Sequence, residues 1–218
     1  QTNQSFLLPA DLNTLCPIAV TDWIEGLEYE LEHADPYLII RGNHEHEDFA
    51  LYRAPLPTTE TRSNPEAWDT LWIPKNGALF SDYEVLENHW IIEYSEEGCG
   101  RYLIAEPNPA AFEIRQELTL STSIHDTHLD PLPGYHRDTI RMRISTPAMP
   151  PEVREIDLTN GKFKQLKVST PPNGHDESNY IVQRSYGISG DGQRIPLTIV
   201  HHRDVTPHPE SPVLLTGY

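Results

Sequence analysis

The sequence predicts an all-β fold, a partial β-propeller, from two observations about its apolar residues. Leu27, Tyr29 and Leu31 alternate with glutamates, which is the period of a strand with one buried face. The apolar runs also recur, because Tyr37 and Trp90 open two similar segments about 50 positions apart. A repeat of about 50 residues with four short strands is typical of a propeller blade. The 20 scattered prolines favour short strands and loops over long helices.

Each predicted strand is an apolar or alternating run bounded by turn residues. Together these strands cover residues 27–33, 37–41, 49–53, 90–94, 101–105, 140–146, 153–158, 163–168, 180–187 and 194–202. Two short candidates, 6–9 and 15–20, precede them, and a last apolar strand is expected at 213–218. Residues 64–66 predict one capped helical turn, whereas 109–118 has a poor helical spacing and is assigned as strand or loop.

Two glycine turns mark hairpins. Asn160-Gly161 and Asp191-Gly192 each stand between two β-rich runs, and glycine supplies the positive φ that a twisted two-residue turn requires. In the second hairpin Pro196 donates no backbone hydrogen bond, which suits an edge strand or an outward-facing position of the ladder. We therefore expect antiparallel strand pairs on both sides of these turns.

A domain boundary is expected near the end of the chain. Residues 169–179 are polar and rich in strand breakers, which is typical of a linker. The predicted domains are residues 1–176 and residues 177–218. The chain begins with Gln1 rather than Met and stops within a predicted strand, so we expect it to be one piece of a longer protein.

The composition excludes several classes of function. A net charge of −17 lacks the basic footprint of a nucleic-acid-binding surface. There is no run of about 18 apolar residues, so no membrane-spanning helix is predicted. Cys16 and Cys99 are isolated and fit neither a disulfide scaffold nor a metal motif. They favour a reducing compartment, the cytoplasm.

The C-terminal hairpin and the segment after it carry a family resemblance. The residues concerned are Ser189, Asp191, Gly192, Ile195, Pro196, Leu197, Pro212, Val213, Leu214, Leu215, Gly217 and Tyr218. Their order resembles the entry into the catalytic domain of the prolyl oligopeptidase family of serine peptidases, and is nearest to the oligopeptidase B branch. Residues 26–43, 49–56 and 155–167 are similar to propeller segments of that branch. The family usually has Tyr where this chain has Thr216.

This resemblance implies a fold and an activity. It implies about three of the family's seven blades, followed by the first antiparallel strands of an α/β-hydrolase domain. The implied activity is that of a serine-type oligopeptidase that cleaves short peptides, with the propeller restricting access by size and with basic residues as one option for the cleavage site. The implied partners are short peptides and the rest of the catalytic domain, with no cofactor. Tyr218 would donate its hydroxyl to the oxyanion.

A nucleophile, a general acid and a general base are not found in the sequence. Ser189 is nearest to the G-x-S-x-G nucleophile turn, but the fifth position is Asp191 and no helical pattern follows. Ser189 is therefore interpreted as a turn residue. We expect the catalytic triad to lie beyond Tyr218, so the isolated chain should be inactive.

Histidines and acidic residues offer two weaker hypotheses. The run 44–48 contains two histidines and three carboxylates, and His125 with His128, or His201 with His202, could add ligands. None of these has a zinc-site spacing, so a solvated loop and no metal are predicted.

The acidic row of Glu28, Glu30 and Glu32 could bind basic peptides, but a solvated strand face is the favoured interpretation. The rival to the peptidase hypothesis is a non-enzymatic propeller that binds a partner through its loops. A G-x-S-x-G turn downstream of Tyr218 would decide between the two.

Overall fold

A computed structural model of the chain describes residues 1–8, 10, 16–108, 110–120, 124–130, 132–171 and 174–217. The regular structure is almost entirely strand, which confirms the predicted all-β fold. The helices of the described residues are two single 3-10 turns, η1 (Pro65–Ala67) and η2 (Glu177–Asn179). Asn64 caps η1 as predicted, by accepting a hydrogen bond from the Glu66 amide. Within these ranges, no helix has the length and apolarity needed to cross a membrane.

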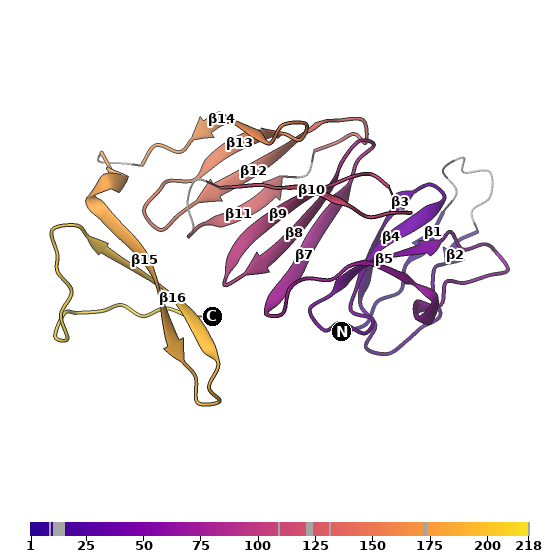
Figure 1. The fold of residues 1–218 in the computed structure, drawn as a ribbon, viewed down its shortest axis with the longest axis horizontal. Coiled ribbons are helices and arrows are strands. Elements are labelled where there is room, and N and C mark those ends of the chain that lie inside the picture. The colour runs from indigo at the N-terminus through magenta and orange to yellow at the C-terminus, as the bar shows by residue number, and fades with distance from the viewer. Residues whose placement is uncertain are drawn as a thin grey trace.

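Three four-stranded antiparallel sheets form the body of the molecule (Figure 1). The first blade contains β3 (Tyr29–Ala34), β4 (Tyr37–Gly42), β5 (Ala50–Pro55) and β6 (Asp69–Trp72). The second contains β7 (Ala78–Val85), β8 (Trp90–Glu96), β9 (Cys99–Ala105) and β10 (Ile114–Glu117). The third contains β11 (Asp126–Asp130), β12 (Thr139–Ser145), β13 (Glu152–Asp157) and β14 (Lys162–Val168). Each sheet keeps its strands in chain order, as propeller blades do.

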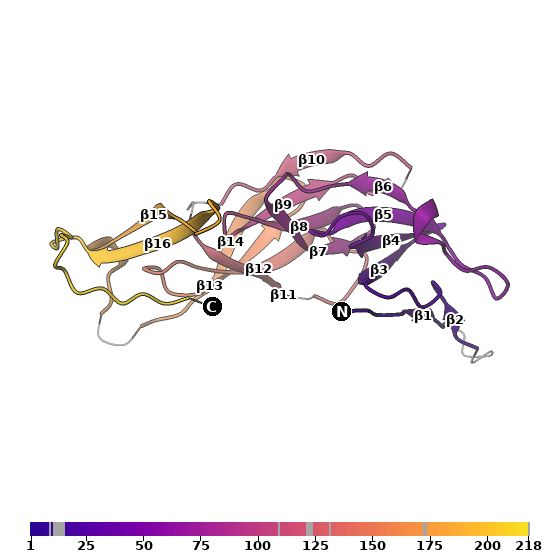
Figure 2. The ribbon, with the colours of Figure 1, turned by 90° about the horizontal axis from the view of Figure 1, so that it is seen from below.

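Two small strand pairs flank the blades. The first pair is β1 (Phe6–Leu7) with β2 (Ile18–Ala19), and the second is the hairpin of β15 (Tyr180–Ile188) with β16 (Arg194–His202). Figures 1 and 2 show the second blade between the other two, and the β15–β16 hairpin at the opposite end of the molecule from the first blade. The ten principal strands predicted from the sequence are confirmed to within about two residues.

The segment 109–118, assigned as strand or loop, contains strand β10, which pairs with β9. Two other sequence expectations were wrong. Residues 213–217 form no strand, because none of the other described segments pairs with them, and Leu214 is 90% exposed. The two glycine hairpins close through loops longer than two residues, 158–161 and 189–193. Side-chain hydrogen bonds support the longer connections, such as that from Thr159 in the first loop to Asp157 at the end of β13.

The continuous apolar run of β4 is explained by burial on both of its faces. Leu38, Ile39 and Ile40 are fully buried. Ile39 joins the core between the first and second blades, whereas Leu38 and Ile40 pack with Val20 and Leu27 from the N-terminal segment. A strand covered on both faces has no polar alternation, since successive side chains point to opposite sides.

The third blade is buried on one face only. Ile140, Met142 and Ile144 of β12 are buried, and the first two belong to the core shared with the second blade. Arg141 and Arg143, on the opposite face of β12, are exposed. This is the alternation of a half-buried strand, and it gives the third blade a charged outer face.

Gly100 of β9 lets the second and third blades approach closely. A methyl group at this position would lie 2.3 Å from Oγ1 of Thr127 in β11. That hydroxyl accepts a 2.8 Å hydrogen bond from Tyr102, which fixes it in place.

We expect Gly100→Ala to lower the free energy of unfolding by about 1–3 kcal/mol, measured by urea denaturation. Gly190→Ala, where the methyl group would meet nothing within 4 Å, should cause no loss, and equal losses in both variants would contradict the interpretation.

A buried histidine links the same two blades. His89, 3% exposed, lies in the β7–β8 turn. Its Nδ1 is 3.0 Å from Nη2 of Arg115, and its Nε2 is 3.1 Å from Oδ1 of Asp138, before β12. Because an arginine can only donate, Nδ1 is the acceptor and the ring is neutral with its proton on Nε2. Arg115 also donates to the carbonyl of Leu158, so it joins the second blade to the third.

This arrangement should make the stability of the blades pH-dependent. Burial and the Arg115 guanidinium lower the pKa of His89 below its ordinary value of 6.5, against the opposing effect of Asp138. The unfolded chain therefore takes up a proton at higher pH than the folded chain. Stability is complete above about pH 6.5 and falls as the pH drops from there toward the lowered pKa.

The difference in unfolding free energy between pH 7.5 and pH 5.5 should be smaller in His89→Gln than in the unmodified chain. His208→Gln, at an exposed histidine, is the matched control and should leave the difference unchanged. An undiminished pH dependence in His89→Gln would refute the assignment.

Candidate functional site

The β15–β16 hairpin carries the residues on which the family resemblance depends. Its two strands pair continuously, from Tyr180 opposite His202 to Ile188 opposite Arg194. Pro196, on β16, lies opposite Tyr186 of β15. In the described part of the chain, β16 pairs only with β15. The proline is thus on an edge strand, as predicted.

Ser189 closes the loop of this hairpin. Its hydroxyl donates to the Asp191 carboxylate and accepts a 3.0 Å hydrogen bond from the Gln193 amide. The Ser189 hydroxyl, followed by the Gln193 amide, holds the pKa of Asp191 below its ordinary range. These contacts are those of a serine that stabilises a turn, and none of the side-chain hydrogen bonds described for it involves a histidine.

The hairpin rests on the β8–β9 turn of the second blade. The Tyr186 hydroxyl donates a 2.7 Å hydrogen bond to Glu97, and Nη2 of Arg184 lies 3.0 Å from Sγ of the buried Cys99. The Arg194 guanidinium stacks 3.9 Å from the Tyr186 ring centre. A hollow of about 300 Å³ lies beside this contact, between the hairpin and the second blade. Elements nearly 90 residues apart are therefore joined by specific polar contacts.

The β8–β9 turn presents Glu97 through an uncommon backbone conformation. Glu97 and Gly98 have φ values of 52° and 74° and form a two-residue connection between strands that pair up to Glu96 and Cys99. Two consecutive positive φ values are typical of a type I′ turn, where Asn or Gly is preferred at the first position. The Glu97 carboxylate accepts the hydrogen bond from Tyr186, a contact that glycine at this position could not make.

Acidic residues gather where the first strands of two neighbouring blades meet. The Tyr83 hydroxyl of β7 donates 2.7 Å to the carbonyl of Ile39, which fixes the second blade against the first. Glu32 of β3 then lies near Glu84 and Asp82 of β7, and burial followed by these two charges raises the pKa of Glu32. The predicted acidic row therefore becomes part of a larger acidic surface, although Glu28 lies outside β3.

Electrostatic neutralisation of this surface is partial. Arg41 lies 3.4 Å from Glu30, and Arg137, in the connection between β11 and β12 of the third blade, pairs with Glu84. Burial raises the pKa of Glu84, whereas Arg137 acts to lower it. An acidic surface with few paired cations attracts positively charged molecules.

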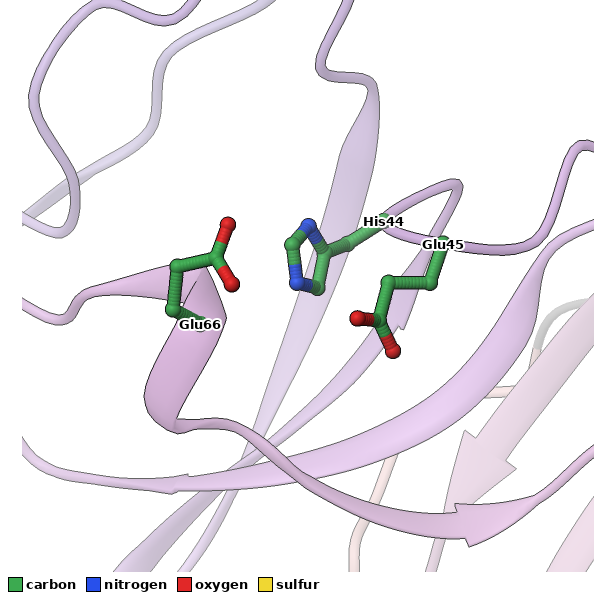
Figure 3. A group of neighbouring side chains, drawn as sticks. All are labelled: His44, Glu45 and Glu66. Atoms are coloured by element: carbon green, nitrogen blue, oxygen red, sulfur yellow. The ribbon is translucent and has the colours of Figure 1, made fainter.

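The remaining candidates are scattered over the fold. His125 bonds the carbonyl of Gly100 through Nε2 at 2.9 Å, and His201 bonds the carbonyl of His202. His44 and Glu45 of the predicted loop cluster meet Glu66 of η1 (Figure 3), a residue that sequence reasoning did not include. Tyr218 lies outside the described residues, so its predicted role stays a prediction.

No family model matches the chain, but individual proteins do. It is 22% identical over 195 residues to dipeptidyl aminopeptidase BI from Pseudoxanthomonas mexicana, covering 88% of this chain and 26% of the relative. It is 23% identical over 204 residues to a prolyl endopeptidase-like protein from Xenopus laevis, covering 93% of this chain and 27% of the relative.

Solved structures share its fold. Oligopeptidase B from Trypanosoma brucei, in a closed form with covalently bound antipain, matches with a TM-score of 0.79 at 19% identity, covering 93% of this chain and 29% of that structure. Oligopeptidase B from Leishmania major matches with a TM-score of 0.77 at 21% identity and the same coverage. The relatives of this chain are peptidases of the prolyl oligopeptidase family. The chain spans less than a third of their length.

The comparisons confirm the resemblance and the propeller fold. At these identities the structural likeness concerns the fold, and the activity of the relatives is not transferred by it alone. The structure also shows that the β15–β16 hairpin contacts the second blade through Arg184 and Tyr186.

Proposed function

We propose that this chain is the propeller-side part of a serine oligopeptidase that hydrolyses short peptides. The observation that carries the proposal is the fold shared with oligopeptidase B over 93% of the chain, which extends beyond the three blades into the β15–β16 hairpin. In this proposal residues 1–176 belong to the propeller and residues 177–218 open the α/β-hydrolase domain. The propeller restricts access to the active site by size.

In this proposal, the residues that form and break covalent bonds lie outside this chain. The nucleophile, general acid and general base come from the rest of the hydrolase domain, and Tyr218 donates to the oxyanion that develops in the transition state. The acidic surface of β3 and β7 supports a preference for basic peptides, because clustered carboxylates raise the local concentration of cations.

The proposed compartment is the cytoplasm. Cys16 is exposed and Cys99 is buried in β9, and no disulfide joins them. Thiols that stay reduced are typical of a reducing compartment.

The test uses the full-length protein and the 218-residue chain side by side. The full-length protein should react with a fluorophosphonate probe and hydrolyse a fluorogenic dibasic peptide, whereas the 218-residue chain should do neither, because it has no nucleophile. A full-length protein that neither reacts with the probe nor cleaves peptides would overturn the proposal in favour of the rival, a non-enzymatic binding propeller. Labelling of the 218-residue chain would place a nucleophile within it and would also refute the proposal.

A further inference from the structure

Three potential metal ligands converge at one end of the first blade. His44 and Glu45 lie in the connection between β4 and β5, and Glu66 lies in η1, which precedes β6. Their ligand atoms all lie within 4.8 Å of one another. Figure 3 shows the His44 imidazole between the two carboxylates, with Glu66 on one side and Glu45 on the other. The group thus joins two connections that are more than 20 positions apart in the sequence.

Surrounding contacts hold the histidine in this position. The Tyr52 hydroxyl, from β5, donates a hydrogen bond to the backbone carbonyl of His44. The His44 ring lies edge-on to Trp68, with 6.0 Å between ring centres, and 6.3 Å from the ring of Tyr52. Trp68 and Tyr52 are themselves buried, so the imidazole packs against the core of the first blade. A ligand held by packing loses little freedom when it binds a metal.

Glu66 is brought to the histidine by the local structure of the chain. Asn64 caps η1 through the Glu66 amide, and the Trp68 indole donates 2.7 Å to Ser63. These bonds fix both ends of the short turn that carries Glu66.

The electrostatics of the group favour a cation. Glu45 and Glu66 make no ion pair with any residue in the described ranges, although the two carboxylates face the same imidazole. Other acidic side chains of the first blade do have such partners, for example Asp69, which lies 2.9 Å from Arg53. Two like charges close together repel each other unless a cation lies between them.

We propose that His44, Glu45 and Glu66 bind one divalent transition-metal ion, Zn²⁺ in particular. Zinc accepts imidazole nitrogen and carboxylate oxygen at about 2.0–2.2 Å in a tetrahedral arrangement. The ligand atoms, which now lie within 4.8 Å of one another, must come closer together to reach those distances, and rotation of the two exposed glutamate side chains supplies this movement. Water takes the fourth position. Magnesium and calcium prefer ligand sets made only of oxygen, so the histidine selects against them.

The bound ion would tie the β4–β5 connection to η1. Binding to the folded state alone stabilises that state by mass action, so zinc should raise the melting temperature. This role is structural, and it is independent of the proposed peptidase activity.

The experiment uses the full-length protein after removal of metals with EDTA. Zinc is titrated by isothermal calorimetry into the unmodified protein, His44→Ala and Glu66→Gln, and His33→Ala and Glu25→Gln serve as matched exposed controls. His44→Ala and Glu66→Gln should bind one zinc ion fewer than the unmodified protein, or should bind it with a Kd more than about tenfold higher. The two control variants should bind zinc as the unmodified protein does. Unmodified protein that binds no zinc, or equal binding by all variants, would overturn the proposal.

The absorption spectrum of bound Co²⁺ tests whether these residues are metal ligands, because residues that only stabilise the fold would not change that spectrum. Co²⁺ in the site should give visible absorption bands that disappear in His44→Ala, because the imidazole is a ligand. Zinc should raise the melting temperature of the unmodified protein and the controls, but not that of His44→Ala or Glu66→Gln. Displacement of zinc by millimolar Mg²⁺ would refute the assignment to a transition metal.

Discussion

Replacing Tyr218 by phenylalanine in the full-length enzyme should lower kcat and kcat/KM together, by about one to three orders of magnitude. The change removes only the hydroxyl and keeps the aromatic ring. In the proposed mechanism that hydroxyl donates to the oxyanion, a bond made mainly in the transition state. An interaction of this kind affects kcat and kcat/KM equally, whereas loss of ground-state binding would raise KM alone.

The matched control is Tyr135→Phe, because Tyr135 is an exposed tyrosine in the connection between β11 and β12. Steady-state kinetics with a fluorogenic peptide should give the control a normal kcat. If Tyr218→Phe also retained a normal kcat, Tyr218 would be a tyrosine with a packing role only, and the oxyanion assignment would be wrong.

Trp90→Ala should destabilise the fold by about 3–5 kcal/mol. Trp90 opens β8, is 2% exposed and belongs to the core cluster between the first and second blades, together with Ile39 and Leu51. Its ring also packs against Phe112 at 6.3 Å between centres. Truncation leaves a cavity that the surrounding strands cannot fill, so both blades lose packing at once.

Urea denaturation followed by circular dichroism measures this effect. Trp23→Ala removes the same side chain from a position that is 64% exposed, and it should change the free energy of unfolding little. Similar losses in both variants would show that Trp90 does not anchor the interface between the blades.

Strands with a strong apolar pattern could be predicted from the sequence, and weakly patterned ones could not. The alternation of Ile140, Met142 and Ile144 located β12, and the apolar run from Tyr37 located β4. The strand β11 reads Asp-Thr-His-Leu-Asp and carries almost no apolar signal of its own. It is a strand because β12 pairs with it residue by residue, which is tertiary context that a single sequence does not contain.

The candidate site shows the same limit. The ligand run at 44–48 was visible in the sequence, but Glu66 reaches His44 only because η1 folds back beside the β4–β5 connection. Likewise the alternation at residues 180–202 predicted the hairpin, whereas the contacts of Tyr186 with Glu97 and of Arg184 with Cys99 join distant segments. Local spacing identifies residue types and turns, and it does not identify partners that packing brings together.

The one-sided burial of the third blade has a consequence for amide hydrogen exchange. The second blade is covered on both sides, so the amides of β8 and β9 can exchange only through an opening that also separates its neighbours. The strand β14 has a single pairing partner in β13, and most of its side chains are exposed. Its amides should exchange through a local opening, at rates that leave the second blade protected. The chain would then lose its structure from the third blade inward, so the blade that carries the hairpin's docking turn is the last to open.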